Sequence, residues 1–313
     1  MSHSRCQEQG DAVEDEGCEN KFTGMNQQPV RHEMITTRRT FDRGWVHIFG
    51  IALVYTLLYA LNLILPLESS PFFHYNNYTT RIWSWSEFAL AGVAFIVLFP
   101  RRRIAIHSFI LAFTLAFLSA GSVYLRNGGI VDAVQEGCVV VVTFLAGSFL
   151  FQQTQGQMVL AFQGGSAKVT RSLFWGVASA MPLAMVNNLF FYLNTGSVAF
   201  KSGWYAAILA LSPGISEEIV FRYFVIALCV TALGVTSKER PGYWAILILS
   251  VVPHSLNHLP DLFLTNPAMA IFMLVATCLL FGLPMAVLQI KRNLETAVAF
   301  HWFIDFARFF FGY

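Results

Sequence analysis

The chain has 313 residues, of which 56% are hydrophobic and 12% charged, and its formal net charge is +2. Soluble domains carry about 25% charged residues, so this composition excludes an ordinary soluble globular protein. Apolar runs of about 20 residues match the thickness of the hydrocarbon core of a bilayer. The sequence therefore predicts an all-α fold, a polytopic bundle of transmembrane helices in a lipid bilayer. We expect no nucleic-acid partner.

The first 44 residues are polar and contain an acidic cluster at Glu14, Asp15 and Glu16. No apolar run follows an early basic start, which argues against a cleavable signal peptide. Residues 1–44 are expected to form a mostly disordered cytoplasmic tail.

The apolar segments that follow predict about eight to nine spans. We divide them into N-terminal transmembrane helices over residues 45–202 and a C-terminal transmembrane core over residues 203–313. The nine segments lie at about 46–66, 83–99, 104–124, 131–151, 172–193, 203–233, 242–262, 267–289 and 294–312.

Basic residues are distributed unevenly between the two sets of loops that these spans would create. If the N-terminus is inside, the inner side collects Arg31, Arg38, Arg39, Arg43, Arg101, Arg102, Arg103, Lys168, Arg171, Lys238, Arg240, Lys291 and Arg292. The outer side holds only Arg81, Arg126 and Lys201. Cytoplasmic loops carry the excess of Lys and Arg, so the N-terminus is expected in the cytoplasm and the C-terminus outside. A bacterial cell membrane is the expected location, with the endoplasmic reticulum as the alternative.

Several polar or aromatic residues have simple structural interpretations. Trp83, Trp85 and Trp204 resemble interfacial anchors, and Asn187 and Asn188 are expected to hydrogen-bond between helices. The charged residues near segment ends, where long side chains reach water, are Glu87, Asp132, Glu136, Glu295 and Arg308.

A few ionisable groups remain inside the apolar segments. A charge at the bilayer centre costs about 2.5–3.5 kcal/mol even on the lenient insertion scale, so such groups survive by facing one another or a wet cavity. They are Glu217, Glu218 and Arg222 in the sixth segment, His254 and His258 in the seventh, and His301 and Asp305 in the ninth.

The spacing of these groups supports a shared site within the membrane. Glu218 and Arg222 are four residues apart, so they can pair on one helix face. The two histidines of the seventh segment repeat this spacing, as do His301 and Asp305. Pro213-Gly214 would interrupt or widen the helix just before the carboxylates. Irregular backbone at this depth is tolerated beside a protein-lined or wet cavity.

Simpler interpretations compete for some of these residues. The pair Glu218–Arg222 is more readily explained as structural than as chemical, and His254 as a packed histidine with one bond. Glu217, His258 and His301 lie on three different helices, and each places an ionisable group inside an apolar segment at a cost in free energy. Three separate structural roles would have to offset that cost three times, so these residues together favour a shared functional site.

The pattern resembles the three motifs of the CPBP family, the intramembrane glutamate-dependent endopeptidases that include CAAX prenyl proteases and bacteriocin-processing proteins. The motifs are Glu-Glu-x-x-x-Arg at 217–222, the histidine helix in "VVPHSLNHL", and His-x-x-x-Asp at 301–305. The resemblance covers about residues 203–312.

The resemblance implies a role for each matched residue. Glu217 would be the general base that activates water, and His258 would share or orient that water. His301 and Asp305, four residues beyond it, would stabilise the oxyanion, and Glu218 and Arg222 would support the site. General-base catalysis and a preorganised oxyanion donor are what peptide hydrolysis requires.

Two positions depart from the family pattern. The second motif usually reads Phe-x-x-x-His, and His254 stands at the phenylalanine position. The third usually ends in Asn, where this chain has Asp305. An ionised aspartate cannot donate, so Asp305 is expected instead to accept a hydrogen bond from His301 and fix its tautomer. Because His258 lies nearer the outer face than His301, a tilt, a break near Pro253 or a different segment boundary must bring them together.

Three functions remain open from the sequence. The first is a metal-free intramembrane endopeptidase acting on a membrane-embedded or lipidated peptide, such as a prenylated C-terminus, a leader peptide or a transmembrane segment. The second adds zinc, held by the histidines and a carboxylate, although the His-Glu-x-x-His helix of zinc proteases is absent. The third is a non-catalytic binding protein or a proton- or ion-coupled transporter.

Overall fold

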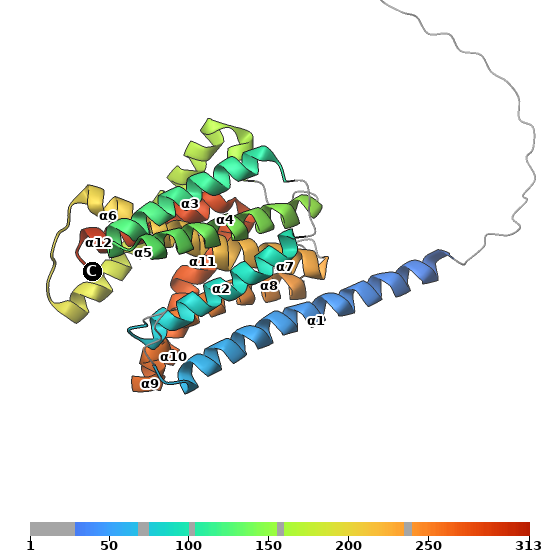
Figure 1. Cartoon of the computed structure of the whole chain (residues 1–313), viewed down its shortest axis with the longest axis horizontal. Coiled ribbons are helices and arrows are strands. Elements are labelled where there is room, and N and C mark those ends of the chain that lie inside the picture. Colours follow the sequence, from blue (N-terminus) through green and yellow to red (C-terminus); the bar gives the residue numbers. More distant parts are fainter. Residues whose placement is uncertain (1–28, 68–74, 100–103, 155–159, 235–239) are drawn as a thin grey trace, which may run out of the picture. The chain divides into compact units, whose positions relative to one another are not determined.

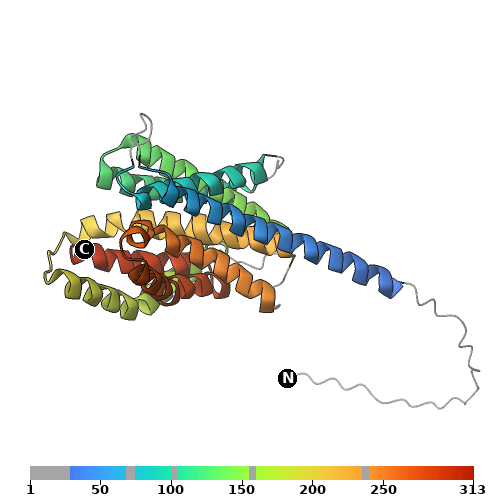
Figure 2. The same cartoon turned by 90° about the horizontal axis from the view of Figure 1, so that it is seen from below.

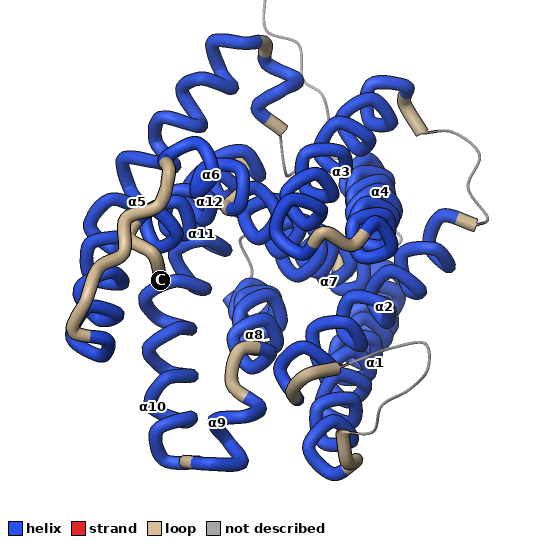
Figure 3. The backbone as a smooth tube through the Cα atoms, turned by 60° about the vertical axis from the view of Figure 1, so that its left-hand side comes forward, coloured by secondary structure: helices blue, strands red, loops and turns tan. Residues whose placement is uncertain are grey.

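A computed structural model describes residues 29–67, 75–99, 104–154, 160–234 and 240–313. Every regular element in these ranges is helical, as Figure 3 shows, and they contain no strand. This confirms the all-α fold. Residues 1–28 lie outside the described structure, so the expectation of a disordered tail stays a prediction there, and from Pro29 onwards the chain is helical.

The chain divides into two units, residues 1–39 and residues 40–313, and the account below concerns the second. Its elements are labelled in Figure 1. In chain order they are α1 (Pro29–Ile64), α2 (Tyr78–Leu98), α3 (Ile106–Asn127), α4 (Ile130–Gln153), η1 (Ala161–Gly164), α5 (Ser166–Thr195), α6 (Gly203–Leu209), η2 (Pro213–Phe224), α7 (Val225–Leu233), α8 (Arg240–Asn257), α9 (Pro260–Thr265), α10 (Pro267–Thr277), η3 (Cys278–Gly282), α11 (Leu283–Lys291) and α12 (Leu294–Phe310).

Among the described residues, six helical stretches are long and apolar enough to cross a membrane. They correspond to five predicted segments before residue 200 and to the one at 267–289. The predicted segment 203–233 is built from three consecutive pieces, α6, η2 and α7, and the last two predicted segments form α8 and α12. The protein is therefore a helical membrane bundle, and eight to nine spans remains an approximate count.

The helices of residues 40–313 run largely along a common direction, which gives this unit two distinct ends (Figure 2). At the Tyr313 end, Lys201 N–H donates to the Phe310 carbonyl, so the C-terminus lies beside the α5–α6 connection. Asp261 of α9 accepts hydrogen bonds from the backbone N–H groups of Tyr78 and Thr79, which joins the α8–α10 connection to the start of α2. The α3–α4 connection lies near the start of α2, because Arg126 and Asp132 line the same cavity as Tyr75 and Asn76.

At the opposite end, which we call the Lys291 end, the start of α12 meets the connection between α4 and α5. Phe162 N–H donates to Glu295 at 2.9 Å, and Asn293 donates to Ser172 at 2.9 Å. The Lys291 ammonium lies over the ring of Tyr243 near the start of α8.

The element that carries the two adjacent glutamates is a π-helical segment, η2. Pro213 has no N–H to donate and stands at its first residue, and a widened turn is one way for a helix to accommodate that loss. The expectation that Pro213-Gly214 widens the helix is confirmed. Gly214 is needed here because a Cβ would lie 3.0 Å from the Trp302 backbone of α12.

Close packing against small residues holds η2 in place. A Cβ on Gly147 of α4 would approach the Tyr223 ring to 2.7 Å, so the ring fills the space that this glycine leaves. Phe144 stacks on the same ring with centroids 5.4 Å apart, and Ser148 bonds the Tyr223 hydroxyl at 3.0 Å. Helix interfaces in membranes use small residues in this way.

One expected interhelical contact is wrong. The Asn188 side chain donates to the Ala184 carbonyl of its own helix, α5, and makes no hydrogen bond to another described helix. Asn187 lines a cavity instead.

Candidate active site

The predicted pair Glu218–Arg222 is confirmed and lies at the centre of the protein. Neither side chain has any exposed surface, and an Arg222 Nη1–H donates to Glu218 Oε1. Both charges lie in the membrane-embedded core, where an unpaired ion would be costly. Their pairing makes this part of η2 a fixed platform for the residues beside it.

His254 of α8 connects this platform to Glu217. Its Nδ1 lies 3.1 Å from Arg222 Nη2, and its Nε2 lies 2.6 Å from Glu217 Oε2. A guanidinium can only donate, so Nδ1 must accept and the ring proton must be on Nε2. Nε2–H therefore donates to the Glu217 carboxylate. The expectation of a packed histidine with one bond is wrong, because both ring nitrogens are engaged.

His301 of α12 reaches both glutamates from the other side. Its Nδ1 lies 2.8 Å from Glu218 Oε1, and its Nε2 lies 3.6 Å from Glu217 Oε2. The same Nε2 is 3.4 Å from Asp305 Oδ2, and the second oxygen of Asp305 lies 3.3 Å from an Arg308 nitrogen. Carboxylates can only accept when ionised, so a His301 ring protonated on both nitrogens can donate on both sides.

His258 lies one turn further along than His254 and is less enclosed. Helix α8 ends at Asn257, so His258 is on the turn that follows and is exposed. Its ring is 5.3 Å from that of His254, and no hydrogen bond joins it to Glu217 in the described structure. His258 therefore lies beyond the end of α8, and His254, one turn earlier, is the residue that meets Glu217. With His254 as the histidine of the second motif, the phenylalanine position falls on Ser250.

Trp83 of α2 covers the two histidines. Its ring lies edge-on to His254 at 5.4 Å and to His258 at 4.9 Å, and it also contacts Phe221. Trp83 was expected to be an interfacial anchor, but its ring contacts are with His254, His258 and Phe221 inside the bundle. Helices before residue 200 complete the site that the later helices begin.

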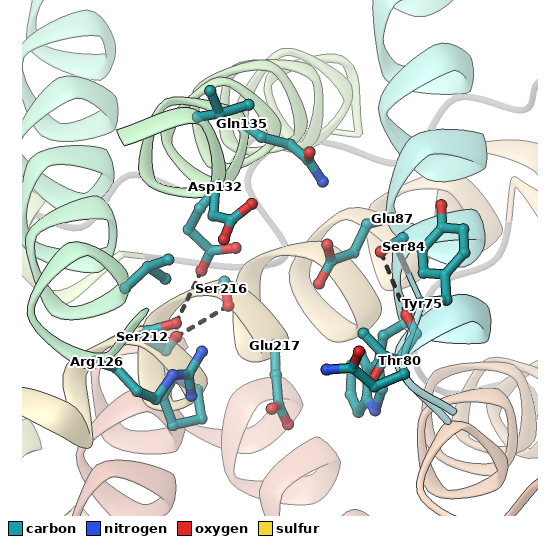
Figure 4. A pocket seen from close by; sticks show the side chains of 16 residues that line it. Tyr75, Thr80, Ser84, Glu87, Arg126, Asp132, Gln135, Ser212, Ser216 and Glu217 are labelled. Carbon is teal, nitrogen blue, oxygen red and sulfur yellow. Dashed lines mark hydrogen bonds between the residues drawn. The ribbon is translucent and has the colours of Figure 1, made fainter. Parts of the chain in front are cut away.

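Two cavities meet at this cluster, and they share no lining residue. A polar cavity of about 710 Å³ contains Glu217 in its wall, together with residues from α2, α3 and α4. Figure 4 shows Glu87, Asp132 and Arg126 around the same space as Glu217. A second cavity of about 390 Å³ is bordered by His254, His258, His301 and Asp305 and by many apolar side chains, among them Phe190, Phe191, Phe272, Met273, Phe281 and Met285. Glu217 and His254, which are 2.6 Å apart, therefore stand on the wall between them.

Three acids that the sequence places near segment ends, Glu87, Asp132 and Glu136, line the polar cavity. Glu136 is only 9% exposed, and one of its oxygens accepts hydrogen bonds from Ser119 at 2.6 Å and Ser212 at 3.0 Å. Glu87 is half-buried and makes no hydrogen bond or ion pair within the described ranges. Because the partners of Glu136 are distant in sequence, no local spacing identifies it.

The site also contains a possible set of metal ligands. One ligand atom from each of Glu217, His254 and His258 lies within 4.8 Å of the other two. However, zinc binds a lone pair on an imidazole nitrogen. Because Arg222 donates to His254 Nδ1, the Nε2 that faces Glu217 carries the proton and has no lone pair to offer. The donor set therefore fits a metal poorly.

Comparison with known families identifies the same region. Residues 199–307, about a third of the chain, match the family model described as Type II CAAX prenyl endopeptidase Rce1-like. No curated protein and no solved structure matches the chain. The matched segment contains every residue of the three motifs, the helices from α6 to α11 and most of α12. The C-terminal third of this helical membrane protein is thus similar to the Rce1-like type II CAAX prenyl endopeptidases.

Proposed function

We propose that this protein is an intramembrane endopeptidase in which Glu217 activates water to hydrolyse a peptide bond of a membrane-associated substrate. The observation that carries the proposal is the environment of the Glu217 carboxylate. Its Oε2 is held by His254, while Oε1 makes no hydrogen bond in the described structure and the side chain lines the polar cavity. A carboxylate held at one oxygen with the other open to water suits a general base.

The reaction would proceed with this chain's own residues. Glu217 Oε1 takes one proton from water as the water oxygen bonds to the scissile carbonyl carbon, and the carbonyl electrons move to its oxygen. When the tetrahedral intermediate collapses, the C–N bond breaks and Glu217 returns the proton to the leaving nitrogen. His254 keeps the carboxylate in position throughout, a role that the sequence analysis assigned to no residue.

His301 is the best-placed donor for the oxyanion. Its Nε2 lies 3.6 Å from Glu217 Oε2, close enough for both groups to act on one substrate carbonyl. Asp305 and Glu218 flank the ring and keep it oriented. Asp305 thus acts through His301, as its chemistry requires, and His258 lies at the entrance to the second cavity, where it can contact the substrate.

The reaction in this proposal uses no metal. The hydrogen bond from Arg222 to His254 supports this, since it leaves no imidazole lone pair directed at Glu217. Activity that survives a strong chelator, in protein with less than stoichiometric zinc by elemental analysis, is the expected result. Stoichiometric zinc that is lost together with activity would reverse the assignment.

We infer that the N-terminus is cytoplasmic, from the thirteen basic residues on its side against three on the other. A bacterial cell membrane is our first choice of location, with the endoplasmic reticulum as the alternative.

The deciding experiment compares new peptide termini in membranes of cells that express the wild type or Glu217→Gln. Glutamine keeps an acceptor for His254 but cannot take a proton. Termini found only with the wild type support proteolysis and identify the substrate. Identical profiles from two folded, inserted proteins would instead favour a binding protein or a proton- or ion-coupled transporter that uses the same buried groups.

A further inference from the structure

We propose that Tyr55 of α1 is a positioning residue for the reaction: together with Asn257 it fixes the last turn of α8, so that His254 meets Glu217. This inference rests on the endopeptidase function proposed above and adds a residue that lies far outside the matched segment 199–307. The contact between one tyrosine hydroxyl and the end of α8 carries it.

The last turn of α8 is a weak part of that helix. Pro253 stands inside α8 and has no N–H, so the helix loses one backbone hydrogen bond to the turn before it. The helix ends four residues later, at Asn257, and the carbonyls of a last turn have no donor within their helix. His254 lies between these two defects, so the backbone hydrogen bonds of α8 hold it less firmly than a residue in the middle of a helix.

Tyr55 contacts this turn from α1. Its hydroxyl oxygen lies 2.6 Å from the Pro253 carbonyl oxygen and 2.6 Å from Asn257 Oδ1. The hydroxyl has one proton, so it donates to one of these oxygens at a time. The Pro253 carbonyl belongs to the peptide group that joins Pro253 to His254, and Asn257 follows His254 by three residues. Tyr55 therefore holds α8 just before and just after His254.

Asn257 extends this connection to α2. Its side chain is fully buried, and its Oδ1 also accepts a hydrogen bond from the Ser86 hydroxyl at 3.4 Å. Ser86 follows Trp83 by three residues, and the Trp83 ring covers His254 with centroids 5.4 Å apart. Asn257 thus joins the turn that carries His254 to the helix that covers its ring.

The remaining surface of α1 offers little else to hold α8. Large apolar side chains of α1 are exposed on the outside of the bundle: Val46, Phe49, Leu53, Val54, Leu57, Leu61 and Ile64. Tyr55, by contrast, is half-buried and directs its hydroxyl at α8. Because no water competes for such a bond at membrane depth, a tyrosine hydroxyl there is held by its protein partners. The contribution of α1 to the site is therefore expected to depend on this hydroxyl.

The effect of Tyr55 must reach the reaction through His254. Tyr55 and Asn257 line neither of the two cavities described above, so neither is placed to contact the substrate. His254 Nε2 lies 2.6 Å from Glu217 Oε2, and a shift of the last turn of α8 would lengthen this hydrogen bond. Loss of the Tyr55 hydroxyl should therefore reduce turnover and leave substrate binding unchanged.

The test is a double-mutant cycle on kcat with Tyr55→Phe and His254→Ala. Tyr55→Phe removes a hydrogen bond of ordinary strength and should lower kcat about 3–10-fold, with KM close to that of the wild type. In the His254→Ala background the same change should lower kcat by less than about twofold, because residues that act through one another are not additive. Thr56→Val is the matched control. It removes an exposed hydroxyl that donates to Ala52 of the same helix, and it should leave kcat unchanged in both backgrounds.

A purely structural role for Tyr55 gives a different result. Tyr55→Phe would then lower the midpoint of thermal unfolding in detergent without changing kcat per folded protein, or it would lower kcat by the same factor in both backgrounds. Either result overturns the proposal. A wild type that cleaves nothing contradicts the endopeptidase function itself, so the two failures are distinguishable.

A second variant keeps the test decisive if Tyr55→Phe is not recovered in a folded form. Asn257→Ala removes one partner of the tyrosine hydroxyl and leaves the Pro253 carbonyl bonded. It should lower kcat in the otherwise native chain and have little further effect beside His254→Ala. Equal losses in the two backgrounds would contradict the proposal here as well.

Discussion

The two cavities that meet at Glu217 differ in chemistry and in the helices that build them. The polar cavity has most of its wall in α2, α3 and α4, which precede the family-matched segment, and a smaller part in η2. The apolar cavity is built mainly from helices of the matched segment and the end of α5. The reactive side chains all come from the matched segment. The comparison teaches that this third of the chain carries the chemistry, while the earlier helices supply its aqueous access.

The sharpest test of this division is Glu217→Gln, for which we expect the largest effect. Loss of a general base lowers the cleavage rate by about 10²–10⁴-fold. Thermal unfolding in detergent should be unchanged, because glutamine can still accept from His254. The matched control is Asp132→Asn, an exposed carboxylate at the mouth of the same cavity, which should retain cleavage. Comparable losses in the two variants would contradict the division.

Removal of Arg222 tests the platform below the site. Arg222→Met leaves Glu218 buried without its counter-ion, which should lower the free energy of unfolding by about 3–5 kcal/mol. The measurement is denaturation in mild detergent. The double variant Glu218→Gln/Arg222→Met should recover part of this loss, since no unpaired charge remains. A single variant as stable as the wild type would show that the pair is dispensable.

The two histidines of α8 and its following turn should differ in their effect on cleavage. His254→Ala removes a hydrogen bond to a charged carboxylate, an interaction that contributes about 1.5–3 kcal/mol, and should lower kcat by about 10–100-fold. His258→Ala should lower kcat less, because His258 makes no hydrogen bond to Glu217 in the described structure. Equal losses, or a larger loss for His258→Ala, would restore the assignment expected from the sequence.

The smallest effect should come from the wall of the apolar cavity. Ala276→Phe would fill part of the 390 Å³ space without touching the ionised cluster. Pocket contacts of this size change binding by about 1–3 kcal/mol, so KM should rise while kcat stays close to that of the wild type. Steady-state kinetics on a peptide identified from the terminus profiles would check this. A fall in kcat alone would mean that the cavity does not hold substrate.

The sequence could predict what depends on local spacing. The i, i+4 pair Glu218–Arg222, the widened turn after Pro213 and the helical bundle follow from neighbouring residues and from apolar run lengths. The sequence assigned the site role to His258 and packing to His254, whereas His254 is the histidine that contacts Glu217. The deciding fact, that α8 ends at Asn257, depends on contacts with distant helices.

Residues from the first helices were the least predictable. Glu136 is held by Ser119 and Ser212, and Trp83 covers His254, yet each is separated in sequence from its partners by a connection or more. From the sequence alone, an acidic residue near the end of a segment gives the same pattern whether its side chain reaches solvent or a cavity between helices. Only the packing of α2, α3 and α4 around η2 distinguishes the two.

The π-helical form of η2 has a consequence for how the chain tolerates changes in length. A π turn accommodates one more residue than an α turn, so η2 behaves as an insertion kept inside a helix. Deleting one residue between Arg222 and Ala227 would leave the glutamates on their platform and turn α7 by about 100° against α4. Deleting one residue between Ser212 and Glu217 would instead turn the glutamates relative to α6. The register of the helix, as much as the identity of its side chains, therefore keeps Glu217 on the wall between the two cavities.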